Sequence, residues 1–335
     1  MIRFLRILFC LAMFSSLAAA QTTLNGAGAT FPYPIYSKWF NEYHNAHSDV
    51  QINYQSIGSG GGIRQVIAGT VDFGASDGPM TDEQLSQFTR GKLLHIPTVL
   101  GAVVPAYDVP GVTAELKFSP DVLADIFLGK ITSWSDDRIK KLNPGVNLPG
   151  KDIVVVHRSD GSGTTYIFTD YLSKISPEWK SSIGKGTSVN WKTGMGGKGN
   201  EGVAGYIRNI QGSIGYIELI YALQNKITYG SVKNASGNFV KASLESTTAA
   251  AAGVTIPADY RVSITNSPSK DAYPIASFTW LLIPQQSKDA NKGKILREFI
   301  EWMATDGQKF TKDLSYAPLP QAVVQKIQVT AKTIK

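Results

Sequence analysis

The chain has 335 residues, a formal net charge of +7 and a single cysteine, Cys10. One cysteine excludes an internal disulfide framework, and the dispersed charges lack the basic block that is typical of a nucleic-acid-binding arm. The length is enough for two hydrophobic cores.

Residues 1–20 have the pattern of a secretory signal peptide. Arg3 and Arg6 precede an apolar run over residues 7–17, and three alanines ending at Ala20 supply small residues for cleavage. The run is too short to span a membrane, and no later run approaches that length. We therefore expect cleavage after Ala20 and export to the periplasm. The mature chain then carries +5, because the removed segment holds two arginines and no acid.

The first part of the mature chain alternates predicted strands and helices. Residues 21–25 and 50–57 are predicted strands, and each runs into a glycine-rich turn and then into apolar residues at helical spacing. The two turns are Gly26-Ala27-Gly28-Ala29-Thr30-Phe31 and Gly58-Ser59-Gly60-Gly61-Gly62. Residues 71–77 predict a buried strand that ends at Asp77. This alternation predicts a sheet whose ligands bind at the carboxyl ends of its strands.

Two long apolar stretches, residues 93–104 and 272–283, are predicted to be strands that cross between two domains. The inserted chain repeats the pattern, with a buried strand at 153–156 and a third glycine-rich turn at 160–164 that leads into a helical stripe. Residues 226–261 are polar and predict a surface excursion with one alanine-rich helix. The predicted domains are residues 21–104 plus 274–335, and residues 105–273.

The three glycine-rich turns predict one anion held from several sides. Each turn exposes the first N–H groups of a helix, where the helix dipole favours negative charge. A tightly bound anion loses its water, so every oxygen needs replacement donors. The candidate donors are the hydroxyls of Thr30, Ser59, Ser162 and Thr164, the N–H groups of Phe31, Gly163 and Thr164, and the guanidinium of Arg158.

Asp77 is the unexpected member of this set, because a carboxylate repels an anion unless a proton lies between them. Inorganic phosphate keeps a proton at ordinary pH and can donate it to Asp77, whereas sulfate is fully deprotonated. An acceptor in the site would therefore reject sulfate. A second predicted role for Asp77 is an ion pair with Arg158 that holds the guanidinium in place.

Several motifs along the chain resemble the phosphate-binding protein of bacterial phosphate ABC transporters, in the periplasmic substrate-binding protein family. The resemblance covers nearly all of the mature chain. It rests on Gly26-Ala-Gly-Ala-Thr-Phe-Pro32, Ile57-Gly-Ser-Gly-Gly-Gly62, Val71-Asp-Phe-Gly-Ala-Ser-Asp77, Ile126-Phe-Leu-Gly-Lys-Ile-Thr-Ser-Trp134, Arg158-Ser-Asp-Gly-Ser-Gly-Thr164, Gly194-Met-Gly-Gly-Lys-Gly-Asn200 and Asp313-Leu-Ser-Tyr-Ala-Pro-Leu319.

The resemblance implies an α/β, two-domain, type II-like binding protein. Each domain would be a mixed sheet flanked by helices, and two crossing hinge strands would join them. The protein would close on phosphate and deliver it to a membrane-embedded ABC permease, as a monomer without cofactor, metal, nucleic-acid partner or catalytic activity. The phosphate-binding residues carried over are Thr30, Phe31, Ser59, Asp77, Arg158, Ser162, Gly163 and Thr164.

The residues leave other readings open. The anion could be another tetrahedral oxyanion, sulfate or molybdate, although Asp77 argues against it. A secreted phosphatase would need a nucleophile with a base, or a metal cluster, and the sequence presents neither. An extracellular adhesion protein is less consistent with a two-domain pattern that lacks repeats. We read the Gly194–Asn200 turn as a structural loop, with the alternative that it touches the domain interface.

Overall fold

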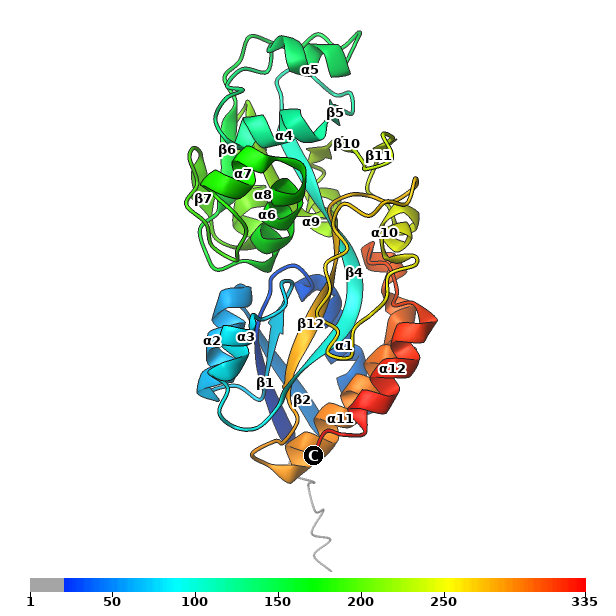
Figure 1. The fold of residues 1–335 in the computed structure, drawn as a ribbon. Coiled ribbons are helices and arrows are strands. Elements are labelled where there is room, and N and C mark those ends of the chain that lie inside the picture. Colours follow the sequence, from blue (N-terminus) through cyan, green and yellow to red (C-terminus); the bar gives the residue numbers. More distant parts are fainter. Residues whose placement is uncertain (1–20) are drawn as a thin grey trace, which may run out of the picture.

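The computed structural model describes residues 21–335, so the predicted signal peptide lies outside the described residues. Figure 1 shows two lobes, one above the other, joined by the long curved strand β4 (Leu93–Asp108). In the described part of the chain, no helix combines the length and apolar character needed to cross a membrane.

The first lobe is a mixed sheet in the order β2-β1-β3-β12-β4. Its other strands are β1 (Thr22–Gly28), β2 (Val50–Ser56), β3 (Phe73–Ser76) and β12 (Ala276–Pro284). Strand β1 runs parallel to β2 and β3, whereas β12 runs antiparallel to β3 and β4. The helices are α1 (Tyr33–Ala46), α2 (Ser59–Ala68), α3 (Asp82–Ser86), α11 (Ala290–Ala304) and α12 (Gln321–Ala331), with 3₁₀ turns η1 (Asp306–Phe310) and η2 (Lys312–Leu314).

Helix α1 illustrates why the predicted periodicity was informative. Its apolar residues at helical spacing are buried: Ile35, Tyr36, Trp39, Phe40 and Tyr43. The indole N–H of Trp39 donates a hydrogen bond to the carbonyl of Gly307 at 2.6 Å. The same face places Phe40 and Tyr43 against Phe299 of α11. One apolar stripe therefore ties the start of the chain to its end.

The second lobe is also a mixed sheet, in the order β4-β8-β6-β7. Its strands are β6 (Val154–Arg158), β7 (Met195–Gly197) and β8 (Ser213–Glu218), with β9 (Thr228–Tyr229) beside β4. Strand β6 is parallel to β7 and β8, and β4 is antiparallel to β8. Its helices are α4 (Pro120–Phe127), α5 (Asp137–Leu142), α6 (Gly163–Ile175), α7 (Pro177–Ser182), α8 (Gly199–Asn209) and α9 (Leu219–Gln224). The prediction of two mixed sheets flanked by helices is confirmed.

Strand β4 belongs to both sheets. Residues 93–102 pair with β12 in the first lobe, and residues 103–108 pair with β8 in the second. This confirms the first predicted crossing strand. The second predicted crossing segment, residues 272–283, is a strand only in part. Residues 272–275 are irregular and return the chain to the first lobe, and β12 follows them and pairs with β3 and β4.

The polar stretch at 226–261 contains the predicted alanine-rich helix, α10 (Leu244–Ala251). It is more than a surface excursion, because β10 (Ser231–Lys233) pairs with β11 (Phe239–Val240) and with β5 (Lys117–Phe118). Val232 is fully buried in this small sheet. The two or three residues of each of these short strands gave no periodic signal in the sequence.

Candidate anion site between the lobes

The eight predicted residues lie where strands end or helices begin. In the first lobe, Thr30 and Phe31 lie between β1 and α1, Ser59 is the first residue of α2, and Asp77 directly follows β3. In the second lobe, Arg158 ends β6, Ser162 is the N-cap of α6, and Gly163 and Thr164 lie in the first turn of that helix. All eight are buried. The first four belong to the first lobe and the last four to the second, so the set is divided between the lobes as the sequence indicated.

Asp77 is held by hydroxyl groups of the first lobe. Its side chain is 1% exposed, and Oδ1 accepts a hydrogen bond from Oγ1 of Thr279 at 2.8 Å. Ser59 Oγ lies 3.4 Å from Asp77 Oδ2 and accepts the backbone N–H of Asp77 at 3.2 Å. Thr279 on β12 was not found from the sequence, since nothing marks one threonine in a buried strand.

Burial raises the pKa of Asp77 from 3.8 to about 7, and the hydrogen bond from Thr279 and the charge of Arg158 oppose the rise. The reason is that a charged carboxylate loses its hydration in the interior. Asp77 therefore changes protonation near neutral pH, in the same range in which phosphate itself gains or loses a proton.

Arg158 is oriented by Asp160. Its Nε donates to Asp160 Oδ1 at 2.8 Å and one terminal nitrogen donates to Oδ2 at 2.5 Å, which leaves the other terminal nitrogen to reach Thr164 Oγ1 at 3.2 Å. The predicted ion pair between Arg158 and Asp77 is therefore wrong. Asp160 is only two residues from Arg158 in the sequence and in the same lobe. Its carboxylate therefore binds the planar guanidinium in place of Asp77, which belongs to the other lobe.

The α6 N-terminus is arranged for an anion. Ser162 Oγ accepts the N–H of Thr165 at 3.0 Å, which caps the helix and holds its first turn in place. Gly163 faces the first lobe so closely that a Cβ there would lie 2.5 Å from both Asp77 Oδ2 and Ser59 Oγ. Only glycine lets the two half-sites approach this far.

Two hydrogen bonds donated by backbone N–H groups join the glycine-rich turns of the two lobes. The N–H of Gly163 donates to Ser59 Oγ at 3.0 Å, and the N–H of Gly60 donates to the carbonyl of Gly161 at 2.9 Å. The lobes are therefore closed on each other, with the predicted anion-binding groups at their contact.

Three further residues at this contact, besides Thr279, were not predicted from the sequence. Asn200, at the start of α8, donates to Thr30 Oγ1 from its side chain at 2.8 Å. The hydroxyl of Tyr221 donates to the carbonyl of Thr30 at 2.6 Å, and that of Tyr316 donates to the carbonyl of Phe31 at 2.5 Å. The glycine-rich turn before α8 was a usable signal for Asn200, and it touches the interface, as the alternative reading allowed. The tyrosines carry no such signal.

Four helices, α1, α2, α6 and α8, begin near the contact and direct their N-termini toward it. Most side chains and backbone groups gathered there can donate hydrogen bonds, and Asp77 adds one carboxylate acceptor. Within residues 21–335, no group of three or more His, Cys, Asp or Glu side chains is placed to hold a metal ion. The arrangement suits a small, dehydrated oxyanion that carries at least one proton.

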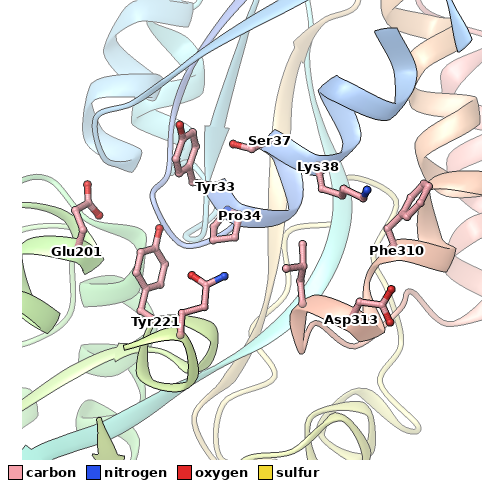
Figure 2. Close-up of a pocket in the computed structure, with 10 residues that line it drawn as sticks. Tyr33, Pro34, Ser37, Lys38, Glu201, Tyr221, Phe310 and Asp313 are labelled. Carbon is pink, nitrogen blue, oxygen red and sulfur yellow. The ribbon is translucent and has the colours of Figure 1, made fainter. Parts of the chain in front are cut away.

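A separate pocket of about 550 Å³ opens beside this contact (Figure 2). It is lined from both lobes, by Tyr33 and Lys38 of α1, Glu201 of α8 and Tyr221 of α9 among others, and by none of the eight predicted residues. Tyr221 separates the pocket from Thr30, since its ring lines the pocket and its hydroxyl bonds the Thr30 carbonyl. The pocket is therefore distinct from the predicted anion site.

Solved structures with the same fold carry names that concern phosphate. A phosphate-bound structure of a high-affinity periplasmic phosphate-binding protein, PfluDING, aligns with a TM-score of 0.74 at 22% identity, covering 92% of this chain and 93% of that one. A phosphate-binding protein from Stenotrophomonas maltophilia aligns with a TM-score of 0.70 at 22% identity and the same coverage. At these identities the likeness concerns the fold.

Sequence relatives are much closer. The phosphate-binding protein PstS of Pasteurella multocida is 48% identical over 321 residues, 95% of this chain and 92% of its own. PstS of Haemophilus influenzae is 46% identical over 318 residues, 94% of each chain. Residues 15–307 match the PBP superfamily domain. The chain therefore belongs to the PBP superfamily and, within it, to the PstS family of phosphate-binding proteins.

Proposed function

We propose that this chain binds inorganic phosphate between its lobes and delivers it to an ABC permease for import. The phosphate would contact Thr30, Phe31, Ser59 and Asp77 of the first lobe. It would also contact Arg158, Ser162, Gly163 and Thr164 of the second. The observation that carries the proposal is the buried carboxyl of Asp77 set among hydrogen-bond donors from both lobes.

This arrangement favours phosphate over sulfate or molybdate. When ionised, Asp77 can accept the proton that phosphate retains, whereas a fully deprotonated oxyanion places a bare negative charge against it. Arg158 supplies positive charge, and Asp160 fixes the direction of its guanidinium. The names of the sequence relatives, phosphate-binding protein PstS, support the same choice of ligand.

The division of the site between two lobes supports a closing mechanism. We assign residues 21–104 plus 274–335 to one domain and residues 105–273 to the other. Phosphate can contact all eight residues only when the domains are closed, so binding shifts the population toward the closed form. The permease could then distinguish the loaded protein from the empty one.

The same proposal includes the location, the oligomeric state and the non-catalytic role of the protein. Cleavage after Ala20 would release the protein into the periplasm, where it would act as a monomer. We assign no catalytic activity, because phosphate is bound by hydrogen bonds and no nucleophile with an adjacent base is needed. A phosphatase assay on the purified protein tests this point: hydrolysis of a phosphate ester that is lost in the Asp77→Asn or Arg158→Ala variant would contradict it.

Calorimetry on the mature protein, stripped of ligand, tests the proposal. Phosphate and sulfate are titrated separately at matched ionic strength near pH 8, where Asp77 is mostly ionised. We expect tight binding of phosphate and no heat from sulfate. Equal binding of both would remove the specificity role of Asp77, and absence of phosphate binding by folded protein would overturn the function. Restored phosphate uptake in cells that lack their own receptor tests delivery to the permease.

A further inference from the structure

The side-chain amide of Asn200 has a fixed orientation. Asn200 is fully buried, and its Oδ1 accepts the backbone N–H of Glu218 at 2.9 Å. A backbone N–H can only donate, so this bond identifies the amide oxygen and leaves the NH₂ group on the opposite side. That NH₂ group donates to Thr30 Oγ1 at 2.8 Å and to Thr164 Oγ1 at 3.1 Å. One amide thus joins a threonine of each lobe.

Both threonine hydroxyls are already full as acceptors. Thr30 Oγ1 also accepts the backbone N–H of Asn200 at 3.3 Å, and Thr164 Oγ1 also accepts from the guanidinium of Arg158 at 3.2 Å. A hydroxyl has two lone pairs and one proton, so each of these oxygens has only its proton left to offer. Asn200 and Arg158 cannot take those protons, because the groups that face the hydroxyls are themselves donors.

The two hydroxyl protons have no acceptor in residues 21–335. Thr30 is 2% exposed and Thr164 is fully buried, and each hydroxyl appears only as an acceptor in its hydrogen bonds with described residues. A buried donor without a partner is costly. An anion between the lobes would satisfy both protons at once.

We propose that Asn200 is a positioning residue for anion recognition, which fixes the hydroxyls of Thr30 and Thr164 as donors and links the two lobes through them. This inference rests on the proposed phosphate function and adds a residue outside the predicted set of eight. The amide fixes the direction in which each hydroxyl donates its hydrogen bond. Without the amide, each hydroxyl could rotate and donate its proton to a different acceptor. With the amide in place, both hydroxyl protons point toward the ligand, whose oxygens accept them.

The test is a double-mutant cycle in phosphate affinity, measured by calorimetry on the mature protein. Asn200→Ala should weaken phosphate binding about tenfold or more in the wild-type background, as expected for lost control of hydrogen bonds to a charged ligand. In a Thr30→Val, Thr164→Val background the same change should cost less than about threefold, because no hydroxyl remains to be oriented. Equal losses in both backgrounds would overturn the proposal, since a merely structural asparagine would not depend on the hydroxyls.

Asn200→Asp provides a second variant of nearly the same shape, in case the alanine variant does not fold. Its carboxylate can only accept, so the hydroxyls should turn toward it, and phosphate binding should weaken more than in Asn200→Ala. Asn209→Asp is the matched control, because Asn209 is exposed at the other end of α8. That control should bind phosphate as the wild type does. Wild-type binding in Asn200→Asp would overturn the proposal, whereas a wild-type protein that ignores phosphate would overturn the proposed function as well.

Discussion

The backbone N–H of Gly163 donates a hydrogen bond to Oγ of Ser59 at 3.0 Å, across the contact between the two lobes. Both residues belong to the proposed phosphate site. In this closed arrangement, a donor of one lobe is therefore satisfied by a hydroxyl of the other. A bound phosphate would exchange this single contact for hydrogen bonds from both residues to the same anion.

Replacement of Gly163 by alanine should prevent full closure. The added Cβ would lie 2.5 Å from Asp77 Oδ2 and Ser59 Oγ, which is closer than such atoms approach one another. We expect Gly163→Ala to weaken phosphate binding by about a hundredfold, because the two half-sites could no longer share one ligand. Calorimetry with phosphate measures the loss.

Gly205→Ala is the control for that change. Gly205 lies inside α8, and a Cβ there would meet no atom within 4 Å. Alanine is the better helix former, so this variant should bind phosphate normally and unfold at the same or a higher temperature. Normal phosphate binding by Gly163→Ala would show that the half-sites do not need this close approach.

The stability of the ligand-free protein should depend on pH through Asp77. Its pKa in the folded protein is raised from 3.8 to about 7, chiefly by burial. A raised pKa means that the contribution of Asp77 to folding is fully present below about pH 4 and is lost as the pH rises to about 7. Asp77→Asn removes this loss. As the pH rises from 4 to 8, the unfolding free energy of the wild type should therefore fall by roughly 4 kcal/mol more than that of the variant.

Urea unfolding of both proteins at several pH values measures that difference. The comparison uses the change with pH, so a constant offset from the new amide cancels. A difference between the two proteins that stays flat from about pH 4 to pH 8 would mean that the pKa of Asp77 is not raised.

Discrimination against sulfate should weaken in acid. Below about pH 7 the carboxyl of Asp77 carries a proton, so it can donate to a deprotonated oxyanion instead of repelling it. Sulfate affinity should then rise up to about tenfold for each unit that the pH falls toward 7, and it should level off below pH 7, where the carboxyl is already protonated. Sulfate titrations over this range provide the measurement, with Asp77→Asn as the control, whose sulfate binding should not follow the same pH dependence.

Thr279 should tune that pH dependence. Its hydroxyl donates to Asp77 Oδ1 at 2.8 Å, and a hydrogen bond to the charged form lowers the pKa of a carboxyl. Thr279→Val should therefore raise the pKa of Asp77 further, by about one unit, and sulfate binding should appear at a correspondingly higher pH. Thr279→Ser keeps the hydroxyl and should behave like the wild type. If Thr279→Val and Thr279→Ser showed the same pH dependence of sulfate binding, the Thr279 hydroxyl would have no effect on the pKa of Asp77.

The local elements of the site were predictable from the sequence because each depends on neighbours in the chain. The turn at Gly58 leads into α2, and Ser162 caps α6, since glycine and serine set the backbone and the cap over a few residues. The pairing of Arg158 was predicted wrongly because two carboxylates compete for one guanidinium. Only their relative positions decide that Asp160 takes it.

Short-range spacing and side-chain chemistry were enough to predict the alternation of strands and helices, the three glycine-rich turns and the residue types that an oxyanion needs. The tertiary structure alone decided which groups share a contact: Thr279 comes to Asp77 from 202 positions away, and Asn200 comes to Thr30 from 170 positions away. It also decided the protonation range of Asp77, because burial acts through everything packed around the carboxyl. Such long-range packing has no period or spacing in the sequence by which it could be recognised.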